Sequence, residues 1–132
     1  MESFLRPWSA QLLSVLRIMT GLTLLSHGTS KYLNFPLSQY SNASPSDPVG
    51  AAGILELVLG ALLVIGLFTR PSAFILSGMC AVVYFYVNAP RGFFPILNGG
   101  ELAIMYCFTL LYIAAAGGGA WSVDKVWRGM KD

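Results

Sequence analysis

The sequence predicts an all-α protein, a polytopic membrane chain whose residues 1–132 form a single antiparallel bundle of four transmembrane helices. Of the 132 residues, 55% are hydrophobic and 11% are charged, whereas about 25% charged residues are usual in soluble domains. The mean hydropathy is +0.65. Because a spanning helix needs about 20 apolar residues, the chain has room for four spans joined by short connections.

The first predicted helix covers residues 9–31, between Trp8 and Tyr32, two aromatic residues that suit headgroup depth. Arg17 interrupts this apolar stretch and no small-residue cleavage site follows it, so we expect a retained helix rather than a removed signal. Proline and serine are frequent after Phe35 and oppose helix formation in lipid. We therefore expect an exterior loop over residues 33–49.

The second predicted helix covers residues 50–68, with Glu56 as its single charge, and the third covers residues 72–88. Pro71 lies between them and can open the third helix as its first residue. The fourth predicted helix covers residues 100–117 and ends at three consecutive glycines, which have low helix propensity. A polar cytoplasmic tail is expected over residues 120–132.

Basic residues in the short flanks predict the orientation, because they concentrate on the cytoplasmic side of a membrane protein. With the N-terminus inside, the exterior flanks hold only Lys31 and Arg91, and the cytoplasmic flanks hold Arg6, Arg70, Lys125, Arg128 and Lys131. Both termini are therefore predicted to be cytoplasmic. The formal net charge of +2 is too small for a groove that follows phosphates, so no nucleic-acid partner is expected.

Ionisable side chains inside a span cost about 2.5 to 3.5 kcal/mol each, which makes them functional candidates by default. The predicted topology gathers polar residues at the exterior side as candidates for ligand binding or proton handling. They are His27, Lys31, Glu56, Glu101 and Asn98, with Asn88, Arg91, Tyr84 and Tyr106 as secondary candidates.

Arg17 is also a candidate, although it lies about 15 Å deeper than His27 along the same helix. Three partners are open to it: the carboxylate of Glu56, backbone carbonyls, or Asp124 near the inner surface.

No metal site is expected, because no ligand-spacing motif is present. A weaker alternative joins His27, Glu56 and Glu101 as two carboxylates and one imidazole, but Lys31 and Arg91 would oppose a cation there. His27 is the only histidine, so neither a bis-histidine haem nor a covalent haem is expected within this chain.

Three functions follow from this polar set. A cavity with aromatic walls, a carboxylate and an imidazole suits an amphipathic ring such as a quinone headgroup. The charges could instead be structural pairs in a non-catalytic scaffold, or could line the path of a small-solute or proton carrier. Glu56→Gln separates these outcomes: a structural pair would lose about 3 to 5 kcal/mol, whereas a ligand-binding or proton-handling carboxylate would leave a folded but silent protein, which is the outcome we expect from the sequence.

Four segments together resemble the DoxX family of small four-helix membrane proteins. They are RIMTGLTLLSHGTSKYL (residues 17–33), ELVLGALLVIGLFTRPSA (residues 56–73), NGGELAIMYCFTLLYIAAAGGG (residues 98–119) and WSVD (residues 121–124). The resemblance covers nearly the whole chain. Two departures stand out, since close relatives often have histidine at the position of Asn88 and Gly-Pro-Gly in place of residues 117–119.

The resemblance implies a protein integral to a bacterial-type inner membrane and tied to a quinone-linked redox or oxidative-stress system. A bound quinone or a redox partner protein would then supply the electron chemistry, and a homo-oligomer is compatible with the pattern. Whether the chain is itself an enzyme or only a subunit of a quinone-linked oxidoreductase is left open. The family motifs map onto most of the polar residues chosen above, including Arg17, His27, Lys31, Glu56, Asn98 and Glu101.

Overall fold

The computed structural model describes residues 2–33, 46 and 48–131, and all regular structure in these residues is helical. In chain order the elements are α1 (Glu2–Leu5), η1 (Arg6–Trp8), α2 (Ser9–Leu33), α3 (Pro48–Ile65), α4 (Thr69–Val83), η2 (Tyr84–Asn88), η3 (Ala89–Arg91), α5 (Pro95–Asn98), α6 (Glu101–Ala116) and α7 (Val123–Lys131). Most of the predicted exterior loop, residues 33–49, lies outside the described residues.

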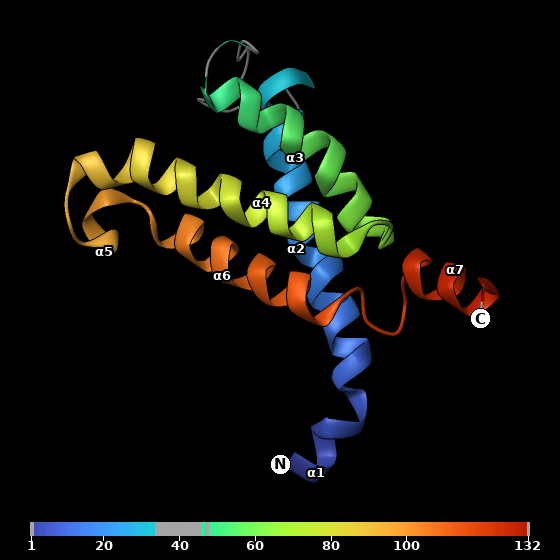
Figure 1. The fold of residues 1–132 in the computed structure, drawn as a ribbon. Helices are drawn as coiled ribbons and strands as arrows, with labels where there is room; N and C mark the ends of the chain where they lie inside the picture. Colours follow the sequence, from blue (N-terminus) through green and yellow to red (C-terminus); the bar gives the residue numbers. More distant parts are fainter. Residues whose placement is uncertain (1, 34–45, 47, 132) are drawn as a thin grey trace.

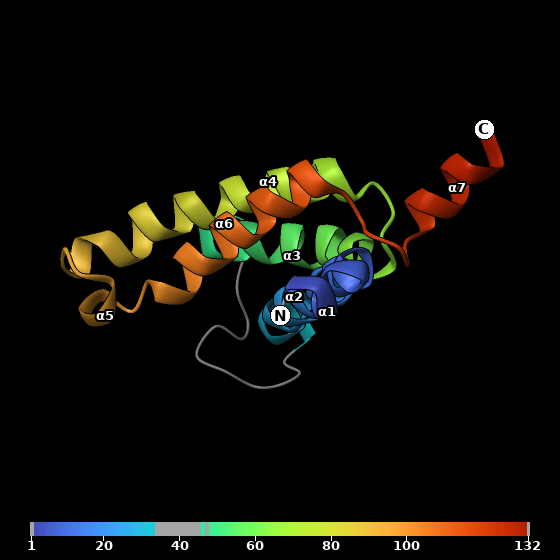
Figure 2. The ribbon, with the colours of Figure 1, turned by 90° about the horizontal axis from the view of Figure 1, so that it is seen from below.

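The four long helices pair as two hairpins. α2 packs mainly on α3, and α4 packs mainly on α6, with α3 and α4 joining the two pairs (Figure 1). Seen from below, α2 points along the view while α4 and α6 run across it (Figure 2). α3 also runs across this view, so the crossing of the two pairs is chiefly that of α2 over the other three long helices, and the four do not share a common bundle axis (Figure 2).

Two helices are long and apolar enough to cross a membrane. They are the continuous helical stretches Arg6–Leu33, of 28 residues, and Thr69–Arg91, of 23 residues. The apolar helices Gly50–Ile65 and Glu101–Ala116 are shorter. At a rise of about 1.5 Å per residue they extend about 24 Å, somewhat less than a hydrocarbon layer of about 30 Å.

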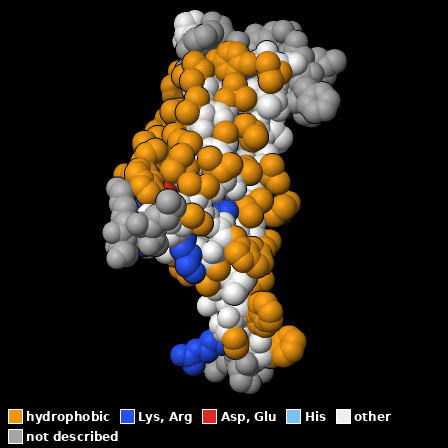
Figure 3. All heavy atoms as spheres, turned by 90° about the vertical axis from the view of Figure 1, so that its right-hand side faces the viewer, with side chains coloured by type: hydrophobic (Ala, Val, Ile, Leu, Met, Phe, Trp, Pro, Cys, Tyr) orange, Lys and Arg blue, Asp and Glu red, His pale blue; other side chains and the backbone are white. Residues whose placement is uncertain are grey.

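Polar and apolar side chains are distributed in the opposite sense to that of a soluble protein. Arg17, Lys31 and Glu56 are buried at 1%, 6% and 4% exposure, whereas Val82 and Phe108 are each 65% exposed. Apolar side chains cover most of the face shown in Figure 3. A surface this apolar is stable only against lipid or another apolar partner, so the chain is suited to a membrane.

Glycines set the close packing of α2 on α3. A Cβ on Gly28 would lie 2.9 Å from the backbone nitrogen of Leu57 and 3.0 Å from the carbonyl oxygen of Gly53. A Cβ on Gly21 would lie 3.1 Å from the carbonyl oxygen of Gly60. The glycines are seven residues apart on each helix, so they fall on one face and let the two backbones approach.

The connection between α3 and α4 and the C-terminal tail differ from what the sequence predicts. The second helix ends at Ile65 and α4 already begins at Thr69, because Gly66 takes a left-handed conformation with φ of 78° and turns the chain early. The predicted polar tail contains the helix α7, whose Asp124 accepts hydrogen bonds of 2.8 Å from the backbone nitrogens of Phe68 and Thr69. The tail thus caps the start of α4.

Candidate functional site

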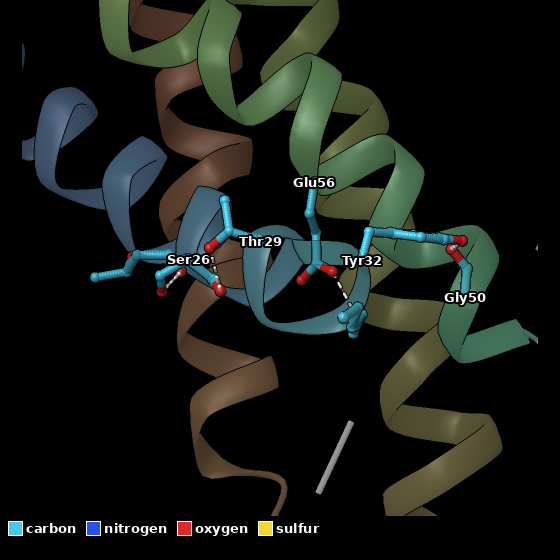
Figure 4. Close-up of polar contacts among 7 residues, drawn as sticks. Ser26, Thr29, Tyr32, Gly50 and Glu56 are labelled. Carbon is cyan, nitrogen blue, oxygen red and sulfur yellow. Dashed lines mark hydrogen bonds and ion pairs between the residues drawn. The ribbon is translucent and has the colours of Figure 1, made fainter. Parts of the chain in front are cut away.

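A buried ion pair joins α2 to α3. Lys31 Nζ lies 2.6 Å from Glu56 Oε1, and the two side chains are only 8% and 5% exposed. Figure 4 shows Glu56 projecting from α3 toward α2, and Tyr32 reaching the carbonyl of Gly50 with its hydroxyl. The glycine contacts between α2 and α3 bring the two backbones close enough for this pair to form.

The ion pair lies in the wall of a cavity of about 350 Å³. Polar side chains from five elements line it, between apolar residues such as Leu24, Met79 and Val83. These polar residues are His27, Lys31, Glu56, Asn88, Arg91 and Tyr106. The volume falls within the range of small-molecule sites, about 300 to 1,000 Å³.

His27 and Tyr106 form the aromatic part of the wall. Their rings meet edge to face, with centroids 6.3 Å apart and an interplanar angle of 86°. His27 lies on α2 one turn before Lys31, so the imidazole, the ammonium and the Glu56 carboxylate line one cavity. Together they offer hydrogen-bond donors, an acceptor and a titratable ring to a ligand.

A π-helical turn brings the end of α4 to the cavity. Over Tyr84–Asn88 the helix widens, and the backbone nitrogen of Ala89 bonds to the carbonyl of Tyr84. The turn contains Val87 and Asn88, which both line the cavity, and Arg91 follows in η3. Such turns inside α-helices occur frequently at functional sites. The sequence pattern did not predict this turn.

Asn98 and Tyr84 lie next to the cavity but do not line it. Asn98 is buried and donates from Nδ2 to the carbonyl of Gly92 at 2.9 Å and to the Tyr84 hydroxyl at 3.2 Å. Its Oδ1 accepts from the backbone nitrogen of Gly100 at 2.8 Å. Asn98 therefore holds together the connection between α4 and α6.

Glu101 is not brought to the ion pair. It is exposed at the start of α6 and lines a neighbouring, more open hollow, which shares Gly99 and Leu102 with the cavity. The weaker metal alternative of His27, Glu56 and Glu101 is therefore not assembled. Among the residues that the structure describes, no three His, Cys, Asp or Glu side chains group as metal ligands.

Arg17 lies at the opposite end of the helices from the ion pair and is bonded to backbone carbonyls, one of the three partners left open by the sequence. Its guanidinium donates to Gly118, to Trp121 at 2.8 Å and to Val64 at 3.4 Å. Ser14 also donates to the carbonyl of Gly118 at 2.9 Å. Arg17 thus binds the turn before α7 to the first hairpin.

A packed apolar layer separates this Arg17 cluster from the cavity. Leu24, Leu63, Leu76, Leu110 and Ile113 belong to one core cluster and are at most 1% exposed. Leu24 lies between Arg17 and His27 on α2, and Leu63 follows Glu56 on α3. In this conformation, apolar side chains fill the interior between the two polar clusters.

Several wall residues were not singled out from the sequence. Met79, Val83 and Val87 recur every four residues along α4 and so share a helix face. That spacing was a usable signal, but in a helix apolar on most sides it does not distinguish a cavity wall from lipid-facing surface.

Comparisons with known proteins assign the chain to one family. The DoxX family model matches residues 12–89. An uncharacterized protein of Haemophilus influenzae is 43% identical over 126 residues, which cover 92% of this chain and 94% of that protein. A second uncharacterized protein of the same organism is 35% identical over 71 residues, which cover 54% of this chain and 47% of that protein. No solved structure matches. The chain belongs to the DoxX family of membrane proteins.

Proposed function

We propose that the protein is an inner-membrane component of a quinone-linked redox or oxidative-stress system and binds a quinone ring in the His27–Glu56 cavity. The observation that carries this proposal is the cavity itself. Charged and hydrogen-bonding groups meet aliphatic walls in a space of about 350 Å³ inside an otherwise apolar helix assembly. An amphipathic ring needs such a mixed environment.

The wall residues fit the quinone in chemistry. His27, Lys31, Asn88 and Arg91 can donate hydrogen bonds to ring carbonyl oxygens, and Leu24, Met79 and Val83 offer apolar contact to the ring face. A bound quinone would accept the electrons, because the side chains that line this cavity do not provide an electron acceptor. The chain's own residues would orient the ring and deliver protons to its oxygens, His27 being the titratable donor.

The proposal includes a topology. All four apolar helices, α2, α3, α4 with its extension, and α6, cross the membrane, and both termini are cytoplasmic. Because α2 crosses the other long helices, the helices would have to tilt strongly from the membrane normal in opposite senses, and the shorter ones can be accommodated by local thinning of the bilayer or by snorkelling of their flanking residues. The cavity then lies toward the exterior face and the Arg17 cluster toward the cytoplasm, as the distribution of basic residues favours.

The packed layer between the two clusters favours binding over transport. A carrier or channel for a small solute or a proton needs a water-accessible path past Arg17, and Leu24, Leu63 and Ile113 fill that region. A scaffold without a ligand would not need a cavity beside the ion pair, because an unfilled space loses packing contacts. Proteoliposome flux with the purified protein distinguishes the carrier from the binding protein.

The test uses His27→Phe, which keeps a ring against Tyr106 but removes both imidazole nitrogens. Protein purified in mild detergent is titrated with decylubiquinone by calorimetry. We expect the parent to bind and His27→Phe to bind about tenfold more weakly with an unchanged melting temperature, because hydrogen bonds to the ring are lost.

Glu101→Gln is the matched control, because Glu101 is a carboxylate at the same end of the helices that lies outside the cavity. It should bind decylubiquinone as the parent does. Absence of binding by the parent, or equal binding by the parent and His27→Phe, would contradict the proposal.

A further inference from the structure

The polar cavity adjoins a second hollow between α3 and α4. This hollow has a volume of about 410 Å³ and is lined by nine residues of α3, α4 and the following turn η2. Four of them also line the polar cavity: Ala52, Met79, Val83 and Val87. These four residues form a shared wall, so the two spaces are direct neighbours. We call the second space the α3/α4 groove.

The α3/α4 groove has the opposite chemistry to the cavity. Apart from Tyr86, every residue that lines it has an aliphatic or thioether side chain, as in Leu55 and Ile75. Its outer edge belongs to the apolar surface, since Ile75 is 48% exposed and Val82 is 65% exposed. In a membrane this edge faces the lipid chains.

The position of the groove follows from how the hairpins form. α2 packs closely on α3, and α4 packs on α6, so α3 and α4 meet where the two hairpins join (Figure 1). On α3 this seam carries Ala51 and Ala52, whose short side chains leave space beside Met79 and Val83 of α4. The seam therefore leads from the lipid-facing surface to the polar cavity.

We propose that the cavity and the α3/α4 groove are two halves of one binding site for a chain-bearing ring that enters laterally from the membrane. The ring lies among His27, the Lys31–Glu56 pair and Asn88, and its apolar chain leaves through the groove between α3 and α4. This inference rests on the proposed function and adds to it the class of ligand and the route by which it enters.

The position of the two spaces on either side of one shared wall favours this occupant over two simpler ones. A water-soluble solute would use the polar cavity and gain nothing from the groove. A lipid acyl chain would use the groove and leave the ion pair, His27 and Asn88 without a ligand group. A molecule with a polar ring and an apolar chain satisfies both halves at once, and each chain carbon placed in the groove gains contact with aliphatic side chains.

The test compares two probes that share one ring. Decylubiquinone carries an apolar chain, and the dimethoxy-methyl-benzoquinone ring alone does not. The groove is blocked from one side by Ala51→Trp and, in a second variant, from the other side by Val82→Trp. Both positions line the groove and not the cavity. The control is Ala61→Trp, an exposed alanine of α3 that lines neither space.

We expect both groove variants to bind decylubiquinone about tenfold more weakly than the parent and to bind the chainless ring within about twofold of the parent. Ala61→Trp should change neither affinity.

Equal weakening for the two probes, or no weakening for either, overturns the inference while leaving ring binding in the cavity intact. If neither probe binds the parent protein, the proposed function fails and the inference fails with it. Loss of a copurifying phospholipid from the groove variants without any change in quinone affinity identifies a lipid as the occupant and also overturns the inference.

Discussion

The Lys31–Glu56 pair is the residue-level feature that both folding and ligand binding use. Its atoms are 2.6 Å apart and both side chains are almost fully buried. Because the structure pairs Glu56 with the buried Lys31 ammonium, we expect Glu56→Gln to lose about 3 to 5 kcal/mol in stability even if Glu56 also binds a ligand. Contrary to the expectation from the sequence, this variant alone therefore does not separate the structural role from the functional one. Lys31→Met should cost a similar amount of stability, because it leaves the Glu56 carboxylate buried without its ammonium partner. Thermal melting in detergent, compared at one protein and detergent concentration, measures both.

The double variant Lys31→Met with Glu56→Met separates the structural role from the functional one. Removing both charges together leaves no buried unpaired ion, so we expect melting close to that of the parent. Decylubiquinone binding should be lost, because the cavity then lacks both members of the ion pair. A double variant that folds and binds normally would show that the pair acts only in assembly.

The sequence was enough to predict that Lys31 and Glu56 lie at the same end of the helices. It was not enough to predict the positions of Glu101 or of the partner of Arg17. The antiparallel order of α2 and α3 and the depths of Lys31 and Glu56 were enough to bring them to the same end. Glu101 was expected there too, but α6 is apolar around its whole circumference, so its sequence does not fix which side faces inward. The partner of Arg17 depends on the turn at residues 117–121, whose path hydropathy does not predict.

At the scale of elements, the α2/α3 interface depends on glycine. Gly28→Ala would place a Cβ within 2.9 Å of the Leu57 backbone nitrogen, so the helices must separate and the ion pair beside them must lengthen. We expect a clear fall in melting temperature and weaker decylubiquinone binding. Gly78→Ala is the control, because a Cβ there meets nothing within 4 Å. Equal melting of the two variants would contradict this account of the interface.

The cap supplied by α7 is a second element-level feature. Asp124 accepts from the backbone nitrogens of Phe68 and Thr69, each at 2.8 Å, and places a negative charge at the start of α4. Asp124→Asn removes the charge and one acceptor, so we expect a loss of about 1 to 2 kcal/mol in stability. Lys125→Ala, at the exposed neighbouring position, should melt like the parent. An Asp124→Asn variant with unchanged melting would show that the cap adds no stability.

At the scale of the whole molecule, the order and approximate extent of the long helices followed from hydropathy and from the positions of proline and glycine. The crossing of α2 over the other long helices did not, because crossing angles depend on which ridges and grooves meet at each interface. The π-helical turn η2 and the groove at the hairpin seam are consequences of that packing. Together, the turn η2 and the α3/α4 groove determine where the cavity approaches the molecular surface.

The orientation of the whole molecule can be measured directly. Reporter fusions after residue 45 and after residue 95 should report the exterior side, and a fusion after residue 128 should report the cytoplasm, in line with the distribution of basic residues. Fusions at 45 and 95 that both report the cytoplasm would reverse the proposed topology and place the cavity toward the cytoplasmic face.

The central claim is that the His27–Glu56 cavity holds a membrane-derived ring. Mass spectrometry of small molecules extracted from the parent protein after purification in mild detergent, beside an equal amount of His27→Phe, tests it most directly. The account predicts a quinone at a near-stoichiometric ratio in the parent and a strongly reduced amount in His27→Phe. An equal amount of quinone in both proteins, or none in the parent, would contradict it.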